Sequence, residues 1–363
     1  MRSLFPSIGS RLSPIGVDLG ARVIKAVQVL TSRSTGRGTV TAALAIPRAE
    51  PDAPFGPADV DRLAQVLGRR GFKGRDVVLA APAARLESDM IEMPARGSGA
   101  PVDELAAAEI GRGAKLDPGG YEAACWDVPV ARAGGAAGTS VLAVALRHAD
   151  AEALVTPFDA AGYRVTAIDV AGCALARICD LGAAPEGSDS GTDAPLRAIL
   201  DLGWQAGVVT LVCGRAVLYH RVLYDCGVGP LYRQLADRHE VGQDAVDMLL
   251  CGDGGASSAR TELSPVARSL VESYAGQVAD ELSASLAFAR HRYAGRAVSA
   301  IKIVGGGAKV RGVAEALSAA VRLPVSPPSA PGGLTLTPGG GDGTGWAQLA
   351  LAAGLALHVG GAS

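Results

Sequence analysis

The feature that most constrains the fold is a short pattern that occurs twice. An apolar strand ends in Asp, then come one residue, a glycine and a second apolar run. The pattern reads Ile-Gly-Val-Asp-Leu-Gly at 15–20 and Ala-Ile-Leu-Asp-Leu-Gly at 198–203. Each copy predicts two strands joined by a tight turn, with an acid that is costly to bury without a partner. The repeat therefore favours two related halves that face each other across a cleft.

A run of three glycines follows a third apolar stretch late in the chain. Ala-Ile-Lys-Ile-Val at 300–304 reads as a buried strand, and Gly305, Gly306 and Gly307 come directly after it. Each of the three glycine turns, taken by itself, is ordinary chemistry for connecting strands. Taken together and in this order, the three turns favour two related halves.

The composition excludes several classes of function. The 363 residues carry 34 Lys and Arg against 36 Asp and Glu, so no basic stripe predicts a nucleic-acid partner. The six cysteines include no Cys-x-x-Cys pair, which favours free thiols in a reducing compartment. No apolar run reaches the ~20 residues that span a bilayer. We therefore expect a cytoplasmic protein without direct membrane insertion, which only a partner would hold at a membrane.

Periodicity and turn residues predict several domains. Strands and a helix before about residue 83 give way to a compact α+β stretch, and a Gly-, Ala- and Ser-rich segment divides the chain near its middle. The predicted domains are a flexible lead at 1–14, a first half at 15–83 and 169–182, an inserted α+β module at 84–168, a linker at 183–196 and a second half at 197–358. The apolar helices expected at 265–291 and 346–357 belong to the core.

Several phrases follow one another along the chain in a fixed order. They are Ile-Gly-Val-Asp-Leu-Gly at 15–20, Val-Val-Leu-Ala-Ala-Pro at 77–82, Leu-Ala-Val-Ala-Leu at 142–146, Ala-Ala-Gly-Tyr-Arg-Val-Thr-Ala-Ile-Asp at 160–169 and Ile-Val-Gly-Gly-Gly at 303–307. In this order they resemble the PilM family, the actin-like proteins of type IV pilus assembly within the actin/Hsp70/FtsA superfamily. The resemblance extends over about 15–358.

The resemblance implies an α/β, actin-like ATPase fold: two RNase H-like halves with an inserted SHS2-like module. It also implies a site for ATP and Mg²⁺, in which both Asp-x-Gly turns hold phosphates, the acids hold Mg²⁺ through water, and the glycine triplet lies beside adenosine. Carried onto this chain, the nucleotide-binding residues are Asp18, Gly20, Lys25, Asp201, Gly203, Gly305, Gly306 and Gly307, with Asp18 and Asp201 on the metal. Lys25 is either the counterpart of the family's hairpin lysine or a solvated residue.

Four positions depart from the family pattern. Ala21 and Trp204 stand where a small hydroxyl residue usually follows Asp-x-Gly. Val246 and Leu249 stand where a Glu and a Lys usually hold ribose and base. Each lost hydrogen bond costs on the order of 1 kcal/mol. We therefore expect weak or absent ATP binding and hydrolysis, and we identify no catalytic residue.

Three classes of function remain open. The first, which we favour, is a scaffold of a type IV pilus or type II secretion complex, peripheral to the inner membrane because it binds the cytoplasmic tail of a single-pass component. The second is an active ATPase or sugar-kinase-like enzyme, which requires a catalytic Asp that the sequence does not reveal. The third is an FtsA-like cell-division filament protein, which would carry an amphipathic membrane tail. For the first class, the family implies a tail-binding groove bounded by 77–82 and 83–93.

Overall fold

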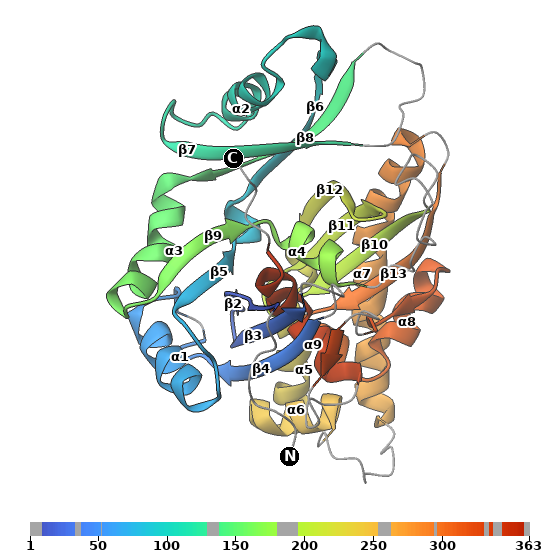
Figure 1. Ribbon diagram of the computed structural model, residues 1–363. Helices are drawn as coiled ribbons and strands as arrows, with labels where there is room; N and C mark the ends of the chain where they lie inside the picture. The colour runs from blue at the N-terminus through green and yellow to red at the C-terminus, as the bar shows by residue number, and fades with distance from the viewer. Residues whose placement is uncertain are drawn as a thin grey trace. The chain divides into compact units, whose positions relative to one another are not determined.

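The computed structural model, drawn in Figure 1, consists of two compact units. The first consists of Met1–Ala81, Ala151–Asp180 and Ser329–Ser363, and the second of Pro82–Asp150 and Leu181–Pro328. The structure describes residues 9–32, 38–51, 53–128, 138–179, 195–252, 263–293, 296–329, 334–336 and 343–358. Within these ranges, every helix is too short or too polar to cross a bilayer.

The first unit is built on a seven-stranded sheet. Its strands are β1 (Ser10–Leu12), β2 (Ile15–Leu19), β3 (Val23–Ser32), β4 (Gly38–Pro47), β5 (Asp76–Ala80), β9 (Arg164–Asp169) and β15 (Leu334–Leu336), in the order β15-β4-β3-β2-β5-β9, with β1 paired to β3. β2 runs antiparallel to β3 and parallel to β5, which runs parallel to β9. The carboxyl ends of β2, β5 and β9 therefore lie at one edge of the sheet.

Helices cover both faces of this sheet. They are α1 (Pro57–Arg69), most of α3 (His148–Ala160), α4 (Ala171–Ile178) and α9 (Gly343–Ala356). Successive side chains of a strand point to opposite faces. Leu79 of β5 accordingly packs in one core with Leu63 of α1 and Phe158 of α3. Val78, the residue before it, packs on the other face with Ala174 and Leu355, so α4 and α9 belong to that second core.

The second unit holds two sheets. A three-stranded sheet consists of β6 (Glu87–Met93), β7 (Tyr121–Asp127) and β8 (Thr139–Arg147) in the order β6-β8-β7. One face of it packs on α2 (Val102–Gly113) through a buried apolar cluster. A five-stranded sheet consists of β10 (Leu196–Leu202), β11 (Gly207–Cys213), β12 (Ala216–Leu223), β13 (Val298–Val304) and β14 (Val325–Ser326), in the order β12-β11-β10-β13-β14.

The remaining helices of the second unit accompany the five-stranded sheet. They are α5 (Gly229–His239), α6 (Gln243–Cys251), α7 (Pro265–Arg292) and α8 (Val313–Val321), with short 3₁₀ turns at η3 (Tyr224–Cys226) and η4 (Gly306–Lys309). Two further 3₁₀ turns, η1 (Ala83–Arg85) and η2 (Arg96–Ser98), lie before and after β6. α7 begins where the Ser264 hydroxyl accepts a hydrogen bond from the N–H of Ala267, at 3.2 Å. Its last turn carries three basic residues, and positive charge there interacts favourably with the negative end of the helix dipole.

The local predictions from the sequence agree with this structure. The Asp-x-Gly turns join antiparallel strands in both places, β2 with β3 and β10 with β11. α9 is lined by buried residues, as expected of a core helix. Within the predicted lead, Ser10–Leu12 form β1. Most of the predicted linker at 183–196 lies outside the described residues, and the predicted domain boundaries stay a prediction.

Candidate functional site

The residues expected to bind nucleotide fall into two groups, one in each unit. Asp18, Gly20 and Lys25 belong to the first unit, and Asp201, Gly203 and the glycine triplet to the second. Each group lies together at the end of a buried strand, β2 in the first case and β10 with β13 in the second. Their roles toward a ligand stay a prediction.

The first turn has an internal ion pair. Asp18 and Lys25 lie opposite each other in the β2–β3 ladder, and the Lys25 Nζ donates to Asp18 Oδ2 at 2.9 Å. The two side chains are only 13% and 10% exposed. A Cβ on Gly20 would lie 2.6 Å from the Val23 carbonyl oxygen and 2.8 Å from Lys25 Nζ. Contacts within the turn therefore explain why residue 20 is glycine, and the carboxylate of Asp18 already has Lys25 as its cationic partner.

A second, buried ion pair supports the same turn and was not foreseen as a pair. Arg48 donates to Asp59 Oδ2 through Nε at 3.1 Å and through a terminal nitrogen at 2.7 Å. The same guanidinium donates to the Ala21 carbonyl at 3.2 Å, and the Arg48 N–H donates to the Arg22 carbonyl at 3.0 Å. Burial raises the pKa of Asp59, but hydrogen bonds from Arg48 and the Ala49 N–H outweigh it and lower the pKa below its usual value. The pair thus fixes the tip of the first hairpin.

A third polar group lies at the same sheet edge and was not among the predicted site residues. Asp169 ends β9, accepts a hydrogen bond from the Val170 N–H at 2.8 Å and forms an ion pair with Arg177 of α4. Nδ1 of His358 lies 3.2 Å from the second carboxylate oxygen. Arg177 also donates to the Gly354 carbonyl of α9 at 2.9 Å. The signal that could have found Asp169 is the one that found Asp18: an acid at the end of a predicted strand.

The second turn is closed by backbone and aromatic contacts. The Gly203 N–H donates to the Ala206 carbonyl, and the Gly203 carbonyl accepts from the Val228 N–H, both at 3.0 Å. Trp204 packs edge-on against Tyr232 of α5 with ring centroids 5.1 Å apart. The Trp204 carbonyl accepts from the Gly229 N–H at 3.0 Å. The position at which the family pattern places a small hydroxyl side chain thus holds an indole that packs against Tyr232 of α5.

The glycine triplet packs on this second turn. Asp201 pairs with Val304 across the parallel β10–β13 ladder, so the triplet begins beside Leu202. A Cβ on Gly305 would lie 2.1 Å from Asp201 Oδ1, and the φ of Gly305 is +83°. A Cβ on Gly307 would lie 2.6 Å from the Leu202 Cβ. A Cβ on Gly306 would meet nothing within 4 Å. Two of the three glycines are therefore explained by internal packing, and only Gly306 leaves open space.

Alanine substitutions distinguish Gly305 and Gly307, where packing excludes a side chain, from Gly306, where there is open space. We expect Gly305→Ala and Gly307→Ala to lower the free energy of unfolding by about 1–3 kcal/mol, because each added methyl group meets atoms of the second turn. Gly306→Ala is expected to leave stability within about 0.5 kcal/mol, as for an ordinary surface position. Chemical denaturation of the three variants checks this. Equal losses in all three would contradict the packing account.

The helix expected to lie at the adenosine is held by apolar packing and by an arginine. Val246 of α6 is completely buried, so its side chain belongs to the core of the second unit. The Arg311 N–H donates to the Leu250 carbonyl at 2.9 Å, and its guanidinium contacts the carbonyls of Leu249 and Leu250. Arg311 thus satisfies carbonyls at the end of α6 that have no partner inside the helix. Val246 and the carbonyl groups at the end of α6 are therefore engaged in contacts within the second unit.

Comparison with known proteins identifies the fold. No family model and no curated protein matches the sequence. A chain of the PilM-PilN type IV pilus biogenesis complex superposes with a TM-score of 0.72 at 19% identity, over 95% of this chain and 98% of that one. The ethanolamine utilization protein EutJ from Carboxydothermus hydrogenoformans superposes with a TM-score of 0.53 at 15% identity, over 98% and 91%. The chain therefore has the α/β, actin-like ATPase fold that the sequence predicted, and within that class its fold is PilM-like.

Proposed function

We propose that this protein is a scaffold of a type IV pilus or type II secretion assembly, and that it acts by binding a protein partner. The observation that carries this proposal is the likeness of 95% of the chain to a component of a pilus biogenesis complex. The internal contacts of both Asp-x-Gly turns support a role without turnover, because the groups that would act on ATP already have partners in the protein.

The partner proposed is the cytoplasmic tail of a single-pass inner-membrane component. The segment 83–93, which the family resemblance implicates, contains β6, and among the described strands β6 pairs with β8 alone. An edge strand offers unpaired N–H and C=O groups, so an extended tail can add to it as a further strand. Binding to this tail would hold the protein at the cytoplasmic side of the inner membrane, as a peripheral component.

Membrane fractionation tests the scaffold proposal. The protein is expected in the membrane fraction of cells that contain the single-pass membrane protein encoded beside it. It should shift to the cytosolic fraction when that neighbour is deleted, because nothing else in the proposal holds it at the bilayer. Unchanged membrane association in the deletion strain would contradict tail binding.

We further propose that the ATP site is degenerate. Lys25 neutralises Asp18, Trp204 fills the position of a hydroxyl, and Val246 belongs to the core. If a nucleotide binds, Asp18 and Asp201 are the residues that would hold its Mg²⁺, and the metal would neutralise phosphate charge. Such a role would require Asp18 to exchange its lysine partner for the hydrated ion.

Calorimetry with Mg-ATP measures this degeneracy. We expect the wild-type protein to show no binding in the micromolar range, because several hydrogen bonds worth on the order of 1 kcal/mol each are missing. Trp204→Thr restores a hydroxyl and is expected to strengthen binding, whereas Phe at the same position is the matched control that restores none. Micromolar affinity in the wild type, abolished by Asp18→Ala, would show an intact site and favour the ATPase class.

A further inference from the structure

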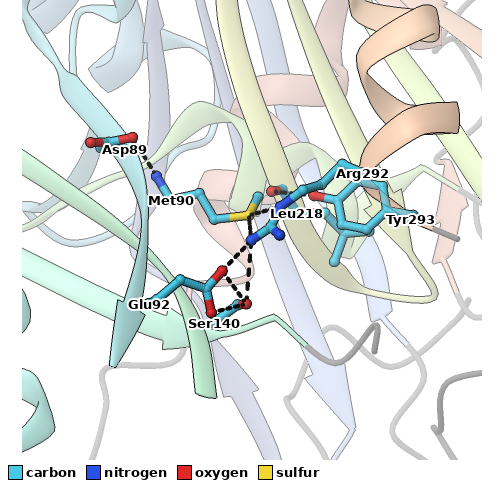
Figure 2. A network of polar contacts seen from close by, with 7 residues as sticks. All are labelled: Asp89, Met90, Glu92, Ser140, Leu218, Arg292 and Tyr293. Carbon is cyan, nitrogen blue, oxygen red and sulfur yellow. Dashed lines mark hydrogen bonds and ion pairs between the residues drawn. The ribbon is translucent and has the colours of Figure 1, made fainter. Parts of the chain in front are cut away.

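Arg292, the last residue of α7, reaches the edge strand of the three-stranded sheet. Its guanidinium donates to a carboxylate oxygen of Glu92 and lies 3.2 Å from the sulfur of Met90 through two nitrogens. Ser140 of β8 donates to both Glu92 oxygens at 3.0 Å. Figure 2 shows the guanidinium between the Met90 and Glu92 side chains, with Ser140 beside them. Residues 200 positions apart in sequence are thus joined at one face of β6.

The end of α7 that carries Arg292 is packed on β12. The neighbouring Tyr293 hydroxyl donates to the Leu218 carbonyl of β12 at 3.1 Å, and both groups are buried (Figure 2). One turn earlier, Phe288 stacks on Tyr219 of β12 with ring centroids 4.7 Å apart. The Arg292 side chain is only 17% exposed, while that of Glu92 is 44% exposed. The arginine is therefore the more buried member of the pair, and Glu92 is the member nearer to solvent.

The other edge of the small sheet has a different anchor. Trp126 of β7 donates its indole N–H to the Val217 carbonyl of β12 at 2.7 Å. This contact holds β7, which is separated from β6 by β8. Loss of the tryptophan hydrogen bond should loosen the sheet at β7, while loss of Arg292 should act on Met90 and Glu92. The two edges can therefore be perturbed separately.

We infer that Arg292 is a positioning residue for partner binding: by gripping Met90 and Glu92, it holds β6 in the extended register that an incoming tail strand requires. This inference rests on the proposed function, because it concerns how the core helix α7 orders the edge strand to which the tail would bind. A tail can add to an edge strand only if the N–H and C=O groups of that strand are regularly spaced. If the strand is already ordered before the tail binds, binding does not have to offset the entropy lost in ordering the strand.

One backbone donor of the same strand is already engaged. The Met90 N–H donates to the carboxylate of Asp89 at 2.8 Å, and Figure 2 shows this contact on the far side of Met90 from Arg292. Asp89 is exposed, so its carboxylate can leave this N–H for water when another acceptor arrives. Met90 is thus held through its sulfur by Arg292, while its N–H can pass from the Asp89 side chain to an added strand.

The test uses the full chain and Arg292→Gln, with Arg290→Gln as the matched control. Arg290 is an exposed arginine in the same last turn of α7. The probe is a synthetic peptide of the cytoplasmic tail of the neighbouring single-pass protein. We expect Arg292→Gln to weaken peptide binding about tenfold and to speed amide hydrogen exchange in β6 about tenfold, since it removes hydrogen bonds to a charged group. Exchange in β7 should not change, and Arg290→Gln should match the wild type.

Glu92→Gln is the second variant, because it keeps the side-chain shape and removes the charge that Arg292 grips. It is expected to weaken peptide binding in the same direction, whereas Trp126→Phe should speed exchange in β7 and leave peptide affinity within twofold. If the wild type binds the peptide and both Arg292→Gln and Glu92→Gln bind it equally well, Arg292 is not a positioning residue. If the wild type binds no peptide, the proposed function itself fails and this inference fails with it.

Discussion

Gly16→Ala is expected to destabilise the first unit by more than about 3 kcal/mol, the upper end of the usual cost of overpacking. A Cβ at this position would lie 2.0 Å from the Ala352 carbonyl oxygen and 2.3 Å from the Ala356 nitrogen. Both atoms belong to the backbone of α9, which cannot rotate away as a side chain can. Gly354→Ala should behave alike, because its Cβ would lie 2.1 Å from the Ala174 carbonyl oxygen of α4. The C-terminal helix thus packs at backbone distance on β2 and on α4.

Equilibrium denaturation of Gly16→Ala, Gly354→Ala and a matched control measures this effect. Gly68 of α1 has no atom within 4 Å of its would-be Cβ, so Gly68→Ala should be neutral or stabilise the helix by about 0.5–1 kcal/mol. The account predicts a large loss of stability at the two test positions and no loss at the control. Should Gly16→Ala and Gly68→Ala unfold at the same denaturant concentration, the described contact between β2 and α9 is wrong.

Removing one partner of the Arg48–Asp59 pair is expected to cost about 3–5 kcal/mol, because a charge with 6% or 5% side-chain exposure is left without its counterion. Asp59→Asn and Arg48→Met should both show the loss. The double replacement with Met and Leu should recover much of it, because no lone charge remains. Thermal or chemical unfolding of the three variants checks the prediction. A double variant as unstable as the single variants would contradict it.

The same pair predicts a pH dependence with a definite sign. The pKa of Asp59 is lowered in the folded protein, so its contribution to stability is present above the usual Asp value of 3.8 and is lost as the pH falls through the lower folded pKa. The control is the ion pair of Arg164 and Asp76, whose side chains are 74% and 47% exposed. Asp76→Asn should change stability by less than about 1 kcal/mol.

The sequence predicted the elements well because their signals are local. Alternating apolar residues and glycine turns identified both Asp-x-Gly hairpins, and apolar residues at helical spacing placed α7 and α9 in the core. The partner of Asp18 could also be predicted from the sequence. An antiparallel hairpin with its turn at Gly20 brings Lys25 opposite Asp18, and the structure has this register.

The remaining features depend on contacts between distant parts of the chain. Asp59 near the start of a helix suggests an interaction with the helix dipole, whereas its main partner is Arg48 in the preceding loop. No local pattern distinguishes Gly16, which needs its missing side chain for α9, from Gly68, which does not. The Arg292–Glu92 contact joins segments that only the folded second unit brings together. Such pairs are set by tertiary packing, which local sequence patterns do not reveal.

The most direct test of the central proposal is a titration of the full chain with the synthetic tail peptide of the neighbouring single-pass membrane protein, with and without Mg-ATP. A scaffold whose Asp-x-Gly turns are closed by its own contacts should bind the peptide saturably in both conditions, with the same affinity and without releasing phosphate. Peptide binding that requires ATP, or phosphate release that the peptide stimulates, would contradict the scaffold account and favour an active ATPase.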